Sequence, residues 1–60
     1  MTRQEFENLK IGDKVQHAFG GIGVVTDKDE GTYTVKDKGF DDGSGCDEVN
    51  FAWNEGKVLT

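Results

Sequence analysis

The spacing of hydrophobic residues near the start of the chain is typical of a helix. Phe6 and Leu9 lie three positions apart, so a helix would place both on one narrow apolar stripe. Thr2 and Glu5 fit the capping box T-x-x-E at a helix start, and Gly12 is suited to end the helix. We therefore predict one short helix within residues 1–11. Because so short a helix is marginal in water, its apolar stripe must dock on another element.

After Gly12 the pattern changes to short alternating runs separated by turn residues, which is typical of strands. The predicted strands are residues 13–17, 22–27, 32–36, 48–53 and 57–60. Five short antiparallel strands predict a mainly β fold, a small five-stranded barrel, because closure removes exposed sheet edges. Gly21 and Gly23 are predicted to permit a sharp bend or a close approach of backbone.

The length of 60 residues allows one domain, residues 1–60, with a small core. Cys46 is the only cysteine, so a disulfide within the chain is excluded and a reducing, cytoplasmic setting is favoured. No apolar run is long enough to cross a membrane, and no signal-peptide pattern is present. We expect a soluble cytoplasmic domain whose spare apolar surface also favours weak homodimer formation.

The net charge of −5 is concentrated in the middle of the chain. Residues 27–48 carry eight acidic residues against three lysines, whereas the segments on either side are neutral. Direct nucleic-acid binding is disfavoured because phosphate contacts need clustered Lys and Arg. An acidic middle suits a basic partner surface, or it serves only to keep a small domain soluble. Residues 37–48, rich in glycine and acids, are predicted to form an acidic loop.

The glycine-rich stretch does not fit a nucleotide-binding loop. Gly21-Ile22-Gly23 leads to Thr26 where the third glycine of a dinucleotide fingerprint belongs, and strand-forming residues follow. The acidic loop resembles a calcium loop only in part. Asp37, Asp41 and Glu48 occupy ligand positions, but Gly39 and Asp42 depart from the pattern. Weak adventitious cation binding remains open, and no dedicated metal site or cofactor is expected.

Catalytic residue types are scarce. His17, Ser44 and Cys46 are each the only residue of their kind, and two of them lie in the acidic loop, where preorganisation is hard. Zinc would need more cysteine and histidine than the chain has. We expect no enzyme activity. His17 is predicted to be a half-buried structural residue with a packed ring and one nitrogen bonded to backbone.

Aromatic residues are numerous for so small a barrel, and large exposed aromatics commonly anchor binding partners. The candidate partner-binding aromatics are Phe19, Tyr33, Phe40 and Trp53. Phe51 is assigned to the core, and Tyr33 and Trp53 also have a core interpretation. Phe40 and Trp53 are the preferred interface candidates, because the first tops the acidic loop and the second ends a strand.

The stretch G-D-K-V-Q-H-A-F-G-G-I-G-V-V, residues 12–25, resembles the start of small Tudor-like barrels that end UvrD/PcrA-type helicases. It is also similar to the RNA-polymerase-interacting domains of the CarD and Mfd type. The shared pattern is roughly G-D-x-V-x-H, a short turn, then G-x-G-x-V, matched by Gly12, Asp13, Val15, His17, Gly21, Gly23 and Val25. Residues 49–59 are similar to the closing hairpin, and KOW-type barrels share the glycine and valine spacing.

This resemblance implies a small five-stranded SH3-like barrel of the Tudor or KOW type. It also implies a module that docks on protein, in several cases RNA polymerase, through strand edges and aromatics. We therefore expect a non-catalytic interaction module for transcription or repair machinery, such as RNA polymerase or a helicase, and a phage or accessory origin fits its small size. Two alternatives stay open. One is nucleic-acid binding of the KOW or Tudor kind. The other is an acidic mimic that occupies a basic channel with Asp41, Asp42, Asp47 and Glu48.

Overall fold

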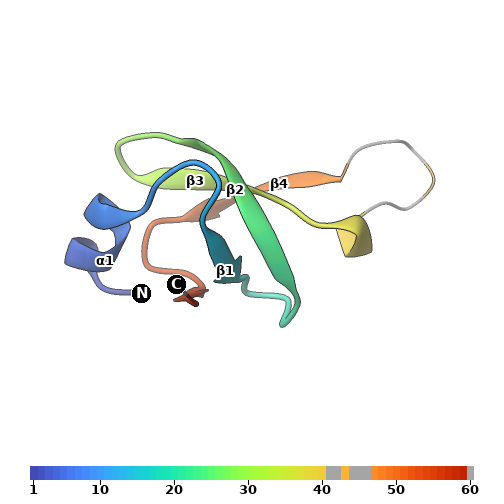
Figure 1. The fold of residues 1–60 in the computed structure, drawn as a ribbon, viewed down its shortest axis with the longest axis horizontal. Helices are drawn as coiled ribbons and strands as arrows, with labels where there is room; N and C mark the ends of the chain where they lie inside the picture. The colour runs from blue at the N-terminus through green and yellow to red at the C-terminus, as the bar shows by residue number, and fades with distance from the viewer. Residues whose placement is uncertain (41–42, 44–46, 60) are drawn as a thin grey trace.

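The computed structural model of the protein describes residues 1–40, 43 and 47–59. A helix, α1 (Arg3–Asn8), precedes five strands and one turn of 3₁₀ helix, η1 (Lys38–Phe40). The strands are β1 (Lys14–Gln16), β2 (Ile22–Lys28), β3 (Thr32–Lys36), β4 (Glu48–Ala52) and β5 (Lys57–Val58). All neighbouring strands are antiparallel, in the order β4-β3-β2-β1-β5 (Figure 1).

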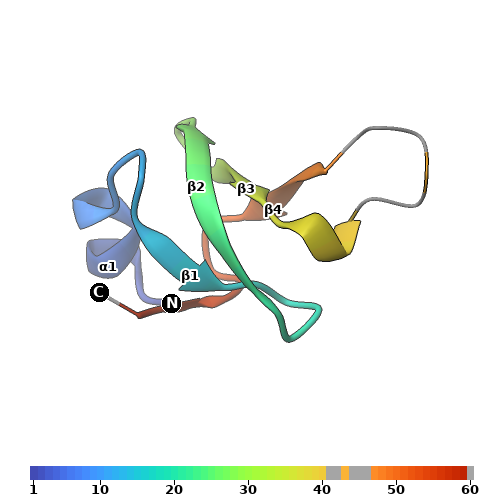
Figure 2. The ribbon, with the colours of Figure 1, turned by 45° about the vertical axis from the view of Figure 1, so that its right-hand side comes forward.

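The predicted mainly β fold, with five strands and a short N-terminal helix, is confirmed. The strands form one open sheet, since no ladder joins β4 to β5 within the described residues. The sheet is strongly twisted, with β2 crossing the direction of β4 steeply in Figure 1. Helix α1 lies at one end of the sheet and η1 at the other, in both Figure 1 and Figure 2.

The core lies on the inner face of this sheet. Alternation along the strands turns one side chain in two inward, and the fully buried members are aliphatic or aromatic. The buried hydrophobic residues are Phe6, Leu9, Val15, Val25, Tyr33, Val35 and Phe51. Phe6 and Leu9 come from α1 and its C-cap, so the predicted docking of the apolar stripe is confirmed.

A bulge in β2 changes which side chains face inward. Val25 lies opposite Val35 and Asp27 lies opposite Thr34, which leaves Thr26 as the extra residue. A bulge inserts one residue and shifts the alternation beyond it by one position. Lys28 consequently lies opposite buried Tyr33 rather than on the outer face.

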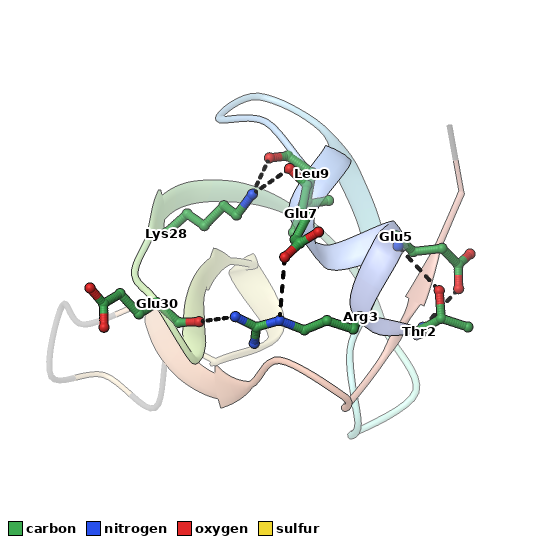
Figure 3. A network of polar contacts seen from close by, with 7 residues as sticks. All are labelled: Thr2, Arg3, Glu5, Glu7, Leu9, Lys28 and Glu30. Carbon is green, nitrogen blue, oxygen red and sulfur yellow. Dashed lines mark hydrogen bonds and ion pairs between the residues drawn. The ribbon is translucent and has the colours of Figure 1, made fainter.

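Lys28, which the bulge turns to the inner face, caps the C-terminal end of α1. Its ammonium donates to the carbonyl oxygens of Glu7 and Leu9, both at 3.0 Å (Figure 3). The same nitrogen lies 4.9 Å from the centroid of the Phe6 ring. A cation at this end satisfies carbonyls that lack a partner within the helix and is attracted to the negative end of the helix dipole.

The N-terminal end of α1 is held as predicted. The Thr2 hydroxyl accepts from the Glu5 amide at 3.1 Å, and the Glu5 carboxylate accepts from the Thr2 amide at 2.9 Å (Figure 3). The Thr2 amide thereby lowers the pKa of Glu5. Arg3 adds a tie to the sheet, because its guanidinium donates to the Glu30 carbonyl at 3.0 Å.

The predicted end of the helix at Gly12 is wrong. The helix ends at Asn8, because Leu9 is already extended with φ −67° and ψ 135°. Gly12 instead has φ +97°, a conformation that favours glycine, in the turn that leads into β1. Its amide donates to the Val25 carbonyl at 2.8 Å, so this turn is tied to β2.

Gly23 marks a close approach of β2 to β3, which confirms that prediction. A Cβ added there would collide with the Val35 side chain and lie 2.7 Å from the Lys36 carbonyl oxygen. A Cβ on Gly21 would lie 2.8 Å from both the His17 Nε2 and an Asp37 carboxylate oxygen. Neither residue has a positive φ, so glycine is needed at both positions for space.

Tyr33 is fully buried among the core residues. Its hydroxyl donates to the Glu55 carbonyl at 2.5 Å, so the one polar atom of the ring has a partner. Burial raises the pKa of Tyr33 above its ordinary value of 10.0, and the nearby Glu55 carboxylate adds to this.

We expect Gly23→Ala to lower the free energy of unfolding by about 2 kcal/mol, a large part of the stability of so small a domain. The loss arises because the backbone carbonyl of Lys36 cannot move away without disturbing the ladder. Urea unfolding followed by the fluorescence of Trp53, the single tryptophan, measures the loss. Gly31→Ala is the matched control: no atom lies within 4 Å of its added Cβ, so stability should stay level or rise by about 0.5 kcal/mol. Equal effects of the two substitutions would contradict the steric role of Gly23.

The chain has a single tyrosine, so the ultraviolet absorbance of the phenolate reports Tyr33 alone. A raised pKa means that the folded protein keeps the proton at a pH where the unfolded chain releases it. The buried neutral phenol of Tyr33 therefore contributes stability that is fully present below pH 10.0, the pKa of the unfolded chain. This stability is lost as pH rises through the higher pKa of the folded protein. We expect the absorbance midpoint above 10.0 in buffer and at 10.0 in urea, and a flatter alkaline loss of stability in Tyr33→Phe. Titration of folded protein at 10.0 would refute this.

Candidate functional site

The single histidine is the centre of a polar and aromatic cluster at the η1 end of the sheet. His17 is buried, and its Nε2 lies 2.6 Å from an Asp37 carboxylate oxygen. The other ring nitrogen, Nδ1, accepts from the Phe19 amide at 3.2 Å. Since Nδ1 is the acceptor, the proton of the neutral ring lies on Nε2, which donates to Asp37. The predicted packed ring with one nitrogen bonded to backbone is confirmed, although the ring is more deeply buried than expected.

Three phenylalanines surround this ring. The His17 ring stacks on Phe51 with centroids 5.7 Å apart, and the Phe40 centroid lies 4.5 Å away. Phe19 meets His17, Phe40 and Phe51 edge to face at 5.5–5.9 Å. We call His17, Phe19, Phe40 and Phe51 the aromatic cluster. Edge-to-face contacts of this kind add to the stabilisation that burial alone gives.

Phe19 is the exposed member of the aromatic cluster, with 72% of its surface accessible. The turn that carries it is closed by three hydrogen bonds. The His17 amide donates to the Gly21 carbonyl, the Gly20 amide donates to the His17 carbonyl, both at 2.9 Å, and the Gln16 side chain donates to the Gly20 carbonyl at 3.1 Å. Gly20 has φ +99°, which a residue with a side chain rarely adopts. A large apolar ring is therefore held outward on a fixed turn.

The candidate aromatics do not form one surface. Phe19 and Phe40 meet in the aromatic cluster, and Phe40 is partly buried at the end of η1. Tyr33 is a core residue and offers no surface to a partner, which corrects its placement among the binding residues. Trp53 packs partly buried against the core, with the Arg3 guanidinium 5.4 Å from its ring centroid. Arg3 belongs to α1, so Trp53 lies beside the helix, whereas Phe40 ends η1.

The described parts of the predicted acidic loop, residues 37–40, 43 and 47–48, include regular structure. Residues 38–40 are η1, and β4 begins at Glu48. Asp47 pairs with Lys36 at 3.8 Å, and the Glu48 carboxylate accepts from the Thr26 hydroxyl at 2.9 Å. Asp41 and Asp42 lie outside the described residues, as do Ser44 and Cys46.

Asp37 is the residue of this site that sequence reasoning missed as a partner of His17. Its carboxylate accepts from His17 and from the Gly39 amide at 3.1 Å, and these hydrogen bonds, His17 first, lower the pKa of Asp37. A pattern could have indicated the pair. If the predicted strands 13–17, 22–27 and 32–36 pair in antiparallel order, the first and third run in the same direction. Their C-terminal ends then lie at the same end of the sheet.

The chemistry open to this arrangement is limited by how its groups are used. Both nitrogens of His17 are engaged, one with a carboxylate and one with a backbone amide, so neither is presented to a substrate. Within residues 1–40, 43 and 47–59, no three metal-ligating side chains gather, and no pocket opens. The features that remain are an exposed aromatic ring and the rigid turn beneath it.

No helix in the described part of the chain has the length and apolar character needed to cross a bilayer. Comparison with known proteins found no matching family model, no matching curated protein and no matching solved structure.

We expect the Asp37 carboxyl group to titrate below 3.8 in a carbon-detected NMR titration of the folded protein. A lowered folded pKa means that the ionised form stabilises the fold. This contribution is fully present above the unfolded value and is lost as pH falls through the folded one. Asp37→Asn should lower the midpoint of urea unfolding at pH 7 and flatten the loss of stability in acid.

Asp29→Asn is the control for that substitution, because it removes the same charge from an exposed turn. The Asp29 carboxylate accepts a hydrogen bond from the neighbouring Glu30 amide. The midpoint of urea unfolding at pH 7 should therefore fall less in Asp29→Asn than in Asp37→Asn. A titration of Asp37 at or above 3.8, or an equal loss in both variants, would show that the His17 contact contributes nothing.

Proposed function

We propose that this chain is a non-catalytic protein-interaction module that docks on transcription or DNA-repair machinery, with bacterial RNA polymerase as the first candidate partner. Phe19 is the central contact, and Phe40 lies beside it. The exposed edges of the open sheet extend the surface. A cytoplasmic location and a phage or accessory origin belong to the same proposal.

The exposed, fixed ring of Phe19 is the observation that carries this proposal. An aromatic side chain loses little conformational entropy on binding when its turn is already ordered, so its burial contributes more fully to affinity. The Phe19 ring contacts three other aromatic rings and its amide bonds to His17, which together fix its direction. An apolar ring with most of its surface in water gains free energy when a partner covers it.

The fold proposed for this module is the SH3-like, Tudor or KOW type of barrel. The strand order β4-β3-β2-β1-β5, the strong twist and the bulge in β2 support it, because all three help a sheet to curl around a core. The matched pattern residues also have structural roles. Val15, His17 and Val25 are buried, and Gly21 and Gly23 fill crowded positions.

An acidic-mimic function has less support from the described residues. Asp47 and Glu48 are partly engaged within the molecule, by Lys36 and Thr26. Neutralising Asp41, Asp42, Asp47 and Glu48 together distinguishes the two functions. Binding through Phe19 should survive that change, whereas binding by mimicry should be abolished.

We expect Phe19→Ala to weaken binding to purified bacterial RNA polymerase at least tenfold (about 1.4 kcal/mol) in biolayer interferometry. The substitution removes the anchor and, because the ring is mostly exposed, should leave the fold intact. Circular dichroism and urea unfolding verify that the variant is folded.

Ile11→Ala is the matched control, since Ile11 is also an exposed apolar residue, 59% accessible, outside the aromatic cluster. It should bind like the unmodified protein. An unmodified protein that binds neither the polymerase nor a UvrD-type helicase would refute the proposed partner class. Equal binding by folded Phe19→Ala would refute the role of Phe19.

A further inference from the structure

The outer face of the sheet, away from the core, combines exposed apolar side chains with lysines. Ile22 is 58% accessible, Val24 39% and Leu59 45%. Together they are three of the five large hydrophobic residues found exposed in the described part of the chain. Apolar residues scattered singly over a surface need no explanation, but a contiguous group commonly marks an interaction site.

The strand register places these residues beside three lysines, of which Lys36, opposite Val24 on β3, is paired with Asp47. The other two are Lys14 and Lys57. Val24 lies opposite Lys14, and Gln16 lies between Ile22 on one side and Lys57 on the other. The Leu59 amide donates to the Lys14 carbonyl at 3.2 Å, which places Leu59 beside Lys14. We call this group the basic face: Lys14, Gln16, Ile22, Val24, Lys57 and Leu59.

The lysines of the basic face are not neutralised by neighbours. Neither Lys14 nor Lys57 forms an ion pair or side-chain hydrogen bond with any described residue, although the chain has 12 acidic residues against 7 basic ones. Glu5 is near enough for Lys57 to contribute to its lowered pKa, but its carboxylate is bonded to Thr2.

Glu48, the exposed acidic residue of β4, is too distant from Lys14 to cancel its charge. Glu48 is on β4, three strands from β1, which at about 4.8 Å per strand is about 14 Å. Screening at physiological ionic strength reduces interactions between exposed charges beyond about 8 Å. The net charge of −5 is a sum over the whole chain, and the two lysines of the basic face form no ion pair with a described residue.

We propose that the basic face binds an acidic segment of a partner protein in which apolar side chains lie among carboxylates. Lys14 and Lys57 pair with the carboxylates, and Ile22, Val24 and Leu59 are covered by the apolar side chains. A nucleic acid suits this face less well. The face has no aromatic ring for base stacking, and branched aliphatic side chains gain nothing from phosphate. Phe19 is not a contact of this surface, whose charged and apolar contacts are Lys14, Lys57, Ile22, Val24 and Leu59. Failure of this proposal would therefore leave the polymerase proposal standing.

The test uses a synthetic peptide of about fifteen residues that mixes Asp and Glu with Leu and Ile, a length that spans several strands. The comparison peptide has Asn and Gln in place of every acid. Titration of the ¹⁵N-labelled full chain with the acidic peptide should shift the amide signals of the basic face and leave those of Phe40 and Phe51 unmoved. The shifts should weaken as salt is raised, because exposed charge pairs are screened.

Substitutions separate charge from apolar contact. Lys14→Glu and Lys57→Glu should each weaken binding about fivefold to tenfold, and the double variant should abolish it. Ile22→Ser should weaken it about fivefold without changing any charge. Lys38→Glu is the matched control, because Lys38 is an exposed residue of η1 outside the basic face and its substitution changes the net charge by the same amount. This variant should bind the peptide within about twofold of the unmodified protein.

Several outcomes would overturn the proposal. They are absence of binding, equal binding of the amide peptide, and shifts confined to residues outside the basic face. Tighter binding of single-stranded DNA or of vesicles rich in phosphatidylserine at the same residues would assign the face to another polyanion. Concentration-dependent shifts of these residues in the protein alone would assign it to a second copy of the chain.

Discussion

The close approach of β2 to β3 at Gly23 is the constraint on which the rest of the structure depends. The Val35 side chain and the Lys36 carbonyl occupy the space that a side chain at position 23 would need. Asp37 follows the last residue of β3, and its carboxylate contacts His17. This contact passes beside Gly21, where a side chain would also collide. Two missing side chains thus let the ends of β1 and β3 meet. The aromatic cluster exists because this meeting point is small enough for His17 to bridge it.

The other end of the sheet is organised by an insertion rather than by a missing side chain. The extra residue Thr26 reverses the alternation of β2, so that Lys28 faces the helix instead of water. Its long chain then serves both the Phe6 ring and the final carbonyls of α1. A helix of six residues has little stability of its own, and here burial of Phe6 and the hydrogen bonds of Lys28 both stabilise it.

Patterns that depend on neighbouring residues were predictable from the sequence, and those that depend on distant ones were not. The capping box of Thr2 and Glu5 is local, and alternation gave all five strands within one or two residues of their observed bounds. The bulge at Thr26 has no such pattern, because it is fixed by the register of two strands. The pairing of His17 with Asp37 likewise needs the register, whereas the core interpretation of Tyr33 followed from alternation and is confirmed. The helix end was misplaced because the positive φ of Gly12 serves a different turn.

Composition is a poor guide to the surface of so small a protein. A net charge of −5 predicts repulsion of acidic partners, yet alternation sorts Lys14 and Lys57 onto one face while most acids lie in residues 27–48. The same alternation exposes Ile22 and Val24, because inward positions of β2 are taken by Gly23 and Val25. Gly23 must be small because Val35 and the Lys36 carbonyl occupy the space of a side chain there, so this inward position of β2 carries no apolar side chain. The crowding that shapes the inner face therefore also explains why apolar residues of the central strand remain on the outer one.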